Sequence, residues 1–140
     1  METRKLEDRL SVAAQLQPAD ISDAAAAGFR AIINNRPDGE ETGQPTSSEI
    51  QAAAQAAGLA YQYIPITPGR FGADNIAAFE QAVAAMPGPV LAYCRTGTRS
   101  ATMWGLCNVA DMGADGVIAA AAEAGCDISG ARPLLLQIAD

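Results

Sequence analysis

The segment that most constrains this chain runs from a short apolar stretch through a polar loop into a run of small and apolar residues. Residues 90–93 are apolar and predict a buried strand, while residues 101–107 predict a buried helix. Between them lies the sequence Cys94-Arg95-Thr96-Gly97-Thr98-Arg99-Ser100. A strand, a short loop and a helix in this order indicate an α/β fold, with the loop at the carboxyl end of its strand.

This loop predicts a cysteine nucleophile inside an anion-binding cradle. Loop N–H groups and the N-terminus of the following helix converge on one spot, which favours a thiolate and an oxyanion there. A lone cysteine at a strand end is usually a core residue. Here two arginines, a glycine and several hydroxyls accompany it, so we predict that Cys94 and Arg99 are catalytic. The predicted substrate-binding residues are Arg95, Thr96, Gly97, Thr98 and Ser100.

The length and net charge of the chain limit its domain organisation and the classes of partner that it can bind. We expect 140 residues to form one domain, residues 1–140, with a core large enough to need no disulfides or metals. A net charge of −7 argues against nucleic acid and anionic membrane surfaces, which require a positive surface. No apolar run approaches about 20 residues, so no membrane span is expected. The start of the chain has no apolar signal core, which predicts a cytoplasmic protein. The positive charge is partly concentrated in the Cys94 loop, which suits a small anion better than a polyanion.

The histidine and cysteine content limits the chemistry further. The chain has no histidine, which excludes a Cys–His dyad, a Ser–His–Asp triad and a histidine-ligated metal within it. Cys94, Cys107 and Cys126 form neither a disulfide framework nor a zinc pattern. We therefore expect no metal and no cofactor. Cys107 is predicted to be a packing residue, and Cys126 to lie in a turn where its thiol could be exposed.

Helical and extended patterns alternate along the chain, which predicts a central, mostly parallel sheet flanked by helices. The predicted strands are residues 29–34, 60–64 and 90–93, and the predicted helices are residues 18–27, 46–57, 74–85, 101–107, 115–124 and 132–138. Residues 35–45 predict a long, turn-rich loop. Asp74 is expected to be the N-cap of the third helix.

Three motifs in register carry a family resemblance: residues 35–40 (Asn-Arg-Pro-Asp-Gly-Glu), residues 63–69 (Tyr-Ile-Pro-Ile-Thr-Pro-Gly) and residues 91–100. Together they resemble the phosphatase-like domain of the beta-lactamase hydrolase-like proteins, from about residue 10 to the C-terminus. The resemblance implies a tyrosine/dual-specificity-phosphatase-like fold. It also implies a partner, because some relatives join this domain to a metallo-beta-lactamase-type persulfide dioxygenase.

The spacing in the loop favours sulfur chemistry. Protein tyrosine phosphatases use Cys-x5-Arg, whereas only four residues separate Cys94 from Arg99. Loops of the form Cys-Arg-x-Gly-x-Arg resemble those of rhodaneses, whose cysteine carries a persulfide. A tighter loop suits a terminal sulfur better than a phosphate. The main prediction is therefore a rhodanese-like sulfurtransferase that forms a persulfide on Cys94 from a small sulfane-sulfur donor such as thiosulfate or a persulfide.

Two alternatives remain open. The first is a cysteine phosphatase that hydrolyses a phosphate ester through a phosphocysteine. In phosphatases the serine or threonine after the arginine hydrogen-bonds the thiolate, so Ser100 is expected either to do this or to be a plain residue at the helix N-terminus. Such an enzyme usually needs a general acid, and the candidates are Asp38 and Asp74. Both have structural explanations, as a turn residue and as a helix cap. The second alternative is a non-enzymatic persulfide or redox sensor that carries a modification on Cys94.

Overall fold

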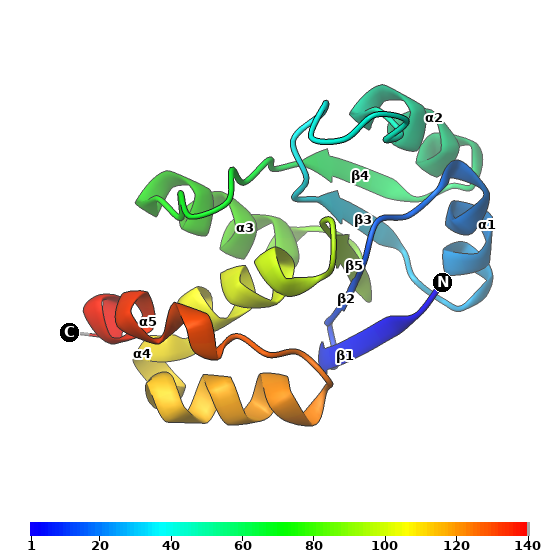
Figure 1. Cartoon of the computed structure of the whole chain (residues 1–140). Helices are drawn as coiled ribbons and strands as arrows, with labels where there is room; N and C mark the ends of the chain where they lie inside the picture. Colours follow the sequence, from blue (N-terminus) through cyan, green and yellow to red (C-terminus); the bar gives the residue numbers. More distant parts are fainter. Residues whose placement is uncertain (140) are drawn as a thin grey trace.

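A five-stranded sheet forms the centre of the computed structural model, which describes residues 1–139 (Figure 1). The strands are β1 (Thr3–Glu7), β2 (Leu10–Ala13), β3 (Ala31–Asn34), β4 (Ala60–Tyr63) and β5 (Val90–Tyr93). Their order across the sheet is β1-β2-β5-β3-β4. Only the β1–β2 pair is antiparallel, and β2, β5, β3 and β4 run parallel. The expected mostly parallel sheet is confirmed.

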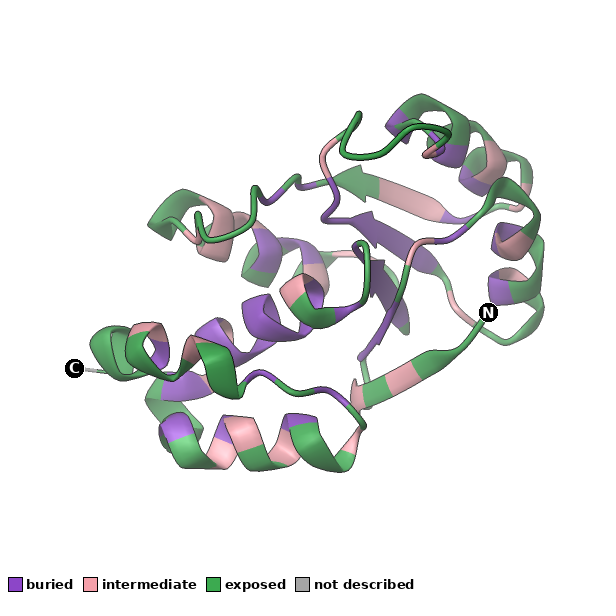
Figure 2. Ribbon diagram, viewed as in Figure 1, coloured by how far each residue is buried: buried purple, intermediate pink, exposed green. Residues whose placement is uncertain are grey.

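Helices cover both faces of this sheet (Figure 1). They are α1 (Pro18–Ala26), α2 (Ser47–Ala56), α3 (Ala73–Ala85), α4 (Thr98–Glu123) and α5 (Arg132–Ala139), with a 3₁₀ turn at Ser129–Ala131. Successive side chains of a strand point to opposite faces. In β5, Leu91 and Tyr93 therefore pack with α1 and α2, while Val90 and Ala92 pack with α3, α4 and α5. Figure 2 shows the central strands buried between the two layers.

The β1–β2 hairpin was not predicted from the sequence. Strand β1 lies at the edge of the sheet, and its residues alternate between exposed and half-buried. Because its charged side chains hide the apolar alternation, an edge strand of this kind resembles a loop in sequence. The hairpin matters for the site, since it places β2 directly beside β5.

The fourth helix begins earlier and runs further than expected. Helix α4 starts at Thr98, inside the polar loop, and continues to Glu123. Gly113, with φ of 76°, interrupts it, so two of the predicted helices are the halves of one bent element. The expected N-cap at Asp74 is wrong, because Gly72 occupies that position in α3. Among residues 1–139, no helix has the length and apolar character needed to cross a membrane.

Candidate active site

The sulfur of Cys94 lies at the carboxyl end of the central strand. Cys94 follows β5 directly and is 1% exposed. The backbone N–H of Gly97 donates a hydrogen bond to Cys94 Sγ at 3.1 Å. Gly97 has φ of 95°, and a Cβ there would lie 3.5 Å from the carbonyl of Ala13. The glycine thus permits the tight turn that aims a backbone donor at the sulfur, and α4 begins at the next residue.

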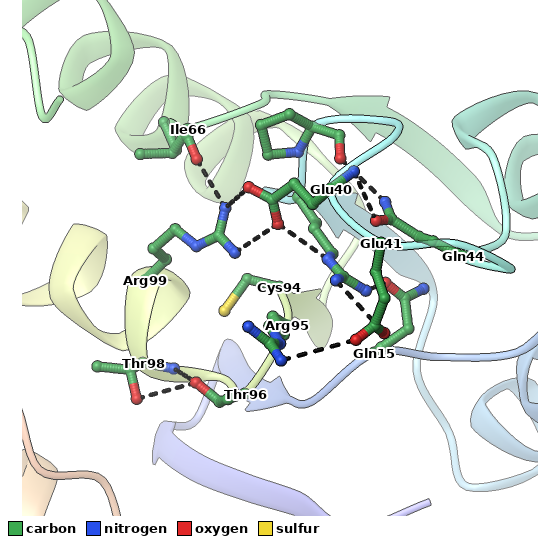
Figure 3. A network of polar contacts seen from close by, with 12 residues as sticks. Gln15, Glu40, Glu41, Gln44, Ile66, Cys94, Arg95, Thr96, Thr98 and Arg99 are labelled. Carbon is green, nitrogen blue, oxygen red and sulfur yellow. Dashed lines mark hydrogen bonds and ion pairs between the residues drawn. The ribbon is translucent and has the colours of Figure 1, made fainter. Parts of the chain in front are cut away.

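A carboxylate holds Arg99 on the other side of this loop. Its Nη1 and Nη2 donate to the two oxygens of Glu40 at 2.8 Å each, and Nη1 also donates to the carbonyl of Ile66 at 2.9 Å. Only 12% of the Arg99 side chain is exposed. The hydrogen bond from Arg99 is the main cause that lowers the pKa of Glu40, so this carboxyl group is ionised at neutral pH. Figure 3 shows this pair close to Cys94.

Two further arginines join the same network. Arg36 is buried, and it donates through Nε to Glu40 at 2.9 Å and through Nη1 to Gln15 at 3.0 Å. Arg95 is largely exposed and forms an ion pair with Glu41 at 3.6 Å (Figure 3). The sequence placed Arg36 and Glu40 only in a family motif and gave them no role. Their contacts join the 35–45 loop to the cysteine loop, so the positive charge predicted there is largely neutralised by carboxylates.

Ser100 makes a different contact from the predicted one. Its hydroxyl donates to Asn35 Oδ1 at 2.8 Å, in a fully buried position, rather than to the sulfur of Cys94. The Asn35 side chain in turn donates to the carbonyl of Ile64 at 2.9 Å. This buried chain of hydrogen bonds links the start of α4 to the ends of β3 and β4. The predicted hydrogen bond from Ser100 to the thiolate is therefore corrected to a structural one.

Thr96 and Thr98 lie at the rim of the loop. The Thr96 hydroxyl donates to Thr98 Oγ1 at 3.2 Å, and both threonines are accessible. With Arg99 they line a cavity of about 290 Å³, and its other lining residues are Phe71, Thr102, Asp127, Ile128, Gly130 and Ala131. Thr96 also borders a second cavity, of about 310 Å³, on the side of Arg36 and Arg95. The loop therefore has a cavity on each side.

Neither predicted acid contacts this loop. The Asp38 carboxylate accepts a hydrogen bond from the backbone of Ser47 at 2.7 Å, which anchors the start of α2. Asp74 is an exposed residue in the first turn of α3. In the described part of the chain, no hydrogen bond or ion pair joins either carboxylate to residues 94–100. The structure thus supports a structural role for Asp38, whereas Asp74 neither caps α3 nor contacts the cysteine loop.

The other two thiols belong to parts of the chain outside the loop. Cys107 is half-buried in α4, and burial together with Glu80 and Glu7 raises its pKa to about 12. Cys126 is buried rather than exposed, contrary to the sequence expectation, and burial raises its pKa as well. Within residues 1–139, no three histidine, cysteine or acidic side chains are grouped to hold a metal ion.

Comparison with known proteins identifies the family. The model of the phosphatase-like domain of the beta-lactamase hydrolase-like proteins matches residues 2–111. This chain belongs to that family. A beta-lactamase hydrolase-like protein from Agrobacterium fabrum is 42% identical over 104 residues, which are 74% of this chain and 24% of the relative. The chain thus spans about a quarter of the length of the curated relatives it matches.

Solved structures show where the fold recurs. The candidate phosphatase nma1982 from Neisseria meningitidis superposes with a TM-score of 0.90 and 35% identity over 96% of both chains. The core catalytic domain of the PP-IP phosphatase SIW14 from S. cerevisiae, solved with citrate, has a TM-score of 0.71 and 11% identity over 98% of this chain and 82% of that one. The fold is thus phosphatase-like, as expected. These names favour the phosphatase alternative over the main prediction of a sulfurtransferase.

Proposed function

We propose that this domain is a cysteine-dependent phosphatase that hydrolyses small phosphate monoesters through a phosphocysteine on Cys94. The observation that carries the proposal is the Gly97 N–H directed at the Cys94 sulfur, beside Arg99 and at the start of a long helix, on a phosphatase-like fold. A thiolate at a helix N-terminus is stabilised, and the same amides suit the oxygens of a phosphoryl group. Fold alone would not carry the chemistry.

The pairing of Arg99 with Glu40 supports this role because it orients the guanidinium group. Arginine has five N–H donors, and Glu40 and Ile66 take three of them. The Nε–H and one Nη2–H have no hydrogen-bond partner among residues 1–139. These two groups form one edge of the planar guanidinium, which suits two oxygens of a phosphoryl group. Glu40 is thus proposed to position Arg99 rather than to compete for the whole side chain.

The proposed reaction has two steps. The Cys94 thiolate attacks phosphorus, an S–P bond forms, and the bond from phosphorus to the ester oxygen breaks, with its electron pair leaving on that oxygen. Water then attacks the phosphocysteine, the S–P bond breaks, and inorganic phosphate and the thiolate are released. Arg99 and the amides of residues 96–100 hold the phosphoryl oxygens in both steps. Arg95 is proposed to bind the rest of an anionic substrate.

The carboxylates near the site decide which esters this reaction suits. The lowered pKa of Glu40 keeps that group deprotonated, so it is a poor proton donor at neutral pH. Asp38 and Asp74 have the structural contacts and positions described above. An aryl phosphate releases an aryloxide, which can leave without being protonated. An alkyl phosphate releases a more basic alkoxide, which needs a proton from an acid. We therefore propose aryl phosphates, including phosphotyrosine, as the preferred class.

Sulfur transfer is the second candidate, favoured by the loop that is one residue shorter than Cys-x5-Arg and by the lack of a free acid. In that reaction the thiolate attacks the outer sulfur of thiosulfate, an S–S bond forms to Cys94, and sulfite leaves with the electron pair. An acceptor thiolate then removes the outer sulfur. This leaving group needs no proton. The partnership with a persulfide dioxygenase, implied by the family resemblance, remains a prediction.

A paired turnover assay tests both candidates. Reduced wild-type protein is given para-nitrophenyl phosphate in one arm, and thiosulfate or glutathione persulfide with an acceptor thiol in the other. Cys94→Ser is the blank in each. Ester hydrolysis that depends on Cys94, with a phosphocysteine seen by mass spectrometry after acid quenching, is expected. Sulfur transfer without ester hydrolysis would overturn the phosphatase proposal and support the second candidate. A stoichiometric persulfide without turnover in either arm would indicate a sensor.

A further inference from the structure

The cavity on the Arg95 side of the cysteine loop has the character of an anion site. Its volume is about 310 Å³, and polar side chains from the 35–45 loop and the cysteine loop line it. Two of these side chains are the guanidinium groups of Arg36 and Arg95. They come from segments almost sixty residues apart in the sequence and meet at the ends of β3 and β5. The cavity directly adjoins Thr96, two residues after the nucleophile.

The two arginines share one loosely held carboxylate. Glu41 lies 3.6 Å from Arg95 Nη2 and 3.9 Å from Arg36 Nη2, and its side chain is 56% exposed. Both separations exceed normal hydrogen-bond lengths, so Glu41 balances charge without filling either donor site. Arg36 Nη2 is buried and has no hydrogen-bond partner in the described chain. A buried guanidinium donor left unpaired is costly, which indicates that another group completes the site.

The cavity is coupled to the catalytic arginine. Glu40 Oε1 accepts hydrogen bonds from Arg36 at 2.9 Å and from Arg99 at 2.8 Å, so the two guanidinium groups meet at one oxygen atom. An anion held by Arg36 and Arg95 would therefore lie next to a phosphoryl group held by Arg99. The three arginines carry more positive charge than the two carboxylates neutralise, and the proposed thiolate of Cys94 supplies the remaining negative charge.

From this arrangement we infer that the Arg36–Arg95 cavity binds a second anionic group of the substrate. Resting on the proposed function, this inference makes the substrate class aryl phosphates that carry an additional carboxylate or phosphate close to the ester. Glu41 occupies the entrance when no substrate is bound and swings into solvent when the second anion enters. Charge-assisted hydrogen bonds from arginine to an anion are strong enough for a preference of at least about tenfold.

The test compares two matched probes, 3-carboxyphenyl phosphate and 3-carbamoylphenyl phosphate, which differ in the charge of one substituent. We expect the wild-type kcat/KM for the carboxylate probe to exceed that for the carboxamide probe by about tenfold. Glu41→Gln removes the competing charge and should raise this ratio about threefold or more, whereas Arg95→Gln should lower it toward one. Glu123→Gln, an exposed glutamate at the end of α4, makes the same charge change elsewhere and should leave the ratio unchanged.

A ratio near one in the wild type, or a ratio that Glu41→Gln does not raise, overturns the inference. A gain in Glu41→Gln cannot arise from misfolding. If neither probe is hydrolysed, the proposed function fails. The preference is then measured by calorimetry, as the ratio of the dissociation constants of the two probes for Cys94→Ser. A preference for the carboxylate in that binding experiment supports the cavity independently of catalysis. Absence of binding by both probes overturns it.

Discussion

A cavity lies at each end of the parallel strands and a cysteine lies close to each end, yet the two cysteines differ in their chemical surroundings. The carboxyl end holds Cys94 between arginines, with cavities of about 290 and 310 Å³ beside it. The amino end has a cavity of about 300 Å³ that is lined by Cys107, Trp104 and the carboxylates of Glu7 and Glu80. The cavities are similar in size, so their volumes do not distinguish the two ends. The two ends differ in the groups that surround each sulfur.

Charge and backbone direction separate the two thiols. Cys94 accepts a backbone N–H at the start of α4, whereas Cys107 lies in the middle of that helix and directs its sulfur at the carbonyl of Ile76, 3.7 Å away. Burial, Glu80 and Glu7 all disfavour a thiolate at Cys107. The comparison teaches that a thiol just before a helix N-terminus is placed to be a thiolate, whereas a thiol between two and three turns inside the same helix is a packing residue.

The most direct test of the difference between the two thiols is to replace each cysteine in turn. Cys94→Ser should reduce kcat/KM for para-nitrophenyl phosphate more than about a thousandfold, because the proposed nucleophile is lost. Cys107→Ser should change it less than about twofold, since that thiol stays protonated and contacts no predicted site residue. Steady-state kinetics on both variants checks this. Comparable losses in the two variants would remove the distinction between the sites.

Replacing the planar guanidinium group of Arg99 should have the next largest effect on kcat/KM. Arg99→Lys should lower kcat/KM about a hundredfold, because lysine has no planar edge with two donors for a phosphoryl group. The matched control is Arg9→Lys, at the amino end, where Arg9 donates to the carbonyls of Val83 and Met86. We expect less than about a twofold change there. Equal effects would mean that Arg99 acts only through general stability.

The raised pKa of Cys107 predicts how its alkylation depends on pH. Only thiolates react, so in Cys94→Ser the rate of Cys107 modification by iodoacetamide should rise about tenfold for each pH unit below a pKa of about 12. From pH about 8 to about 10 this is roughly a hundredfold increase. Peptide mass spectrometry follows the labelled cysteine. A rate that levels off near pH 9 would contradict the assignment.

The smallest expected effect concerns the stability that Glu40 provides. Glu40→Gln should lower the free energy of unfolding by about 1–3 kcal/mol near neutral pH, because charge-assisted bonds to two arginines are lost. The folded pKa of Glu40 lies below its ordinary value of 4.5. Its contribution is therefore present above about 4.5 and is lost as the pH falls through the folded pKa. Urea unfolding at several pH values measures the difference.

The control for that measurement is Glu80→Gln, at the amino-end cavity. Glu80 is exposed, so this substitution should cost less than about 0.5 kcal/mol. A pH-independent loss in Glu40→Gln would show that the carboxylate charge is not what stabilises the 35–45 loop.

Much of the site was predictable because it is local in sequence. The strand at residues 90–93, the turn at Gly97 and the helix that follows are encoded within about twenty residues, by short-range patterns of the kind that periodicity detects. The hydrogen bond from Ser100 was predicted wrongly, because its partner is Asn35, 65 positions away. The β1–β2 hairpin was missed for a different reason, because the charged side chains of the edge strand β1 hide its apolar alternation although its partner is adjacent in sequence.

By itself the sequence determined the strand, loop and helix around Cys94, the alternation of helices and strands and the family. The tertiary structure alone decided which charges surround the sulfur. Glu40 and Arg99 are 59 residues apart and meet only because β3 pairs with β5, which brings the loops after both strands to one edge of the sheet. Electrostatic interactions depend on distance in space, whereas periodicity reports only separation along the chain. The balance of three arginines against two glutamates around Cys94 is therefore a property of the fold.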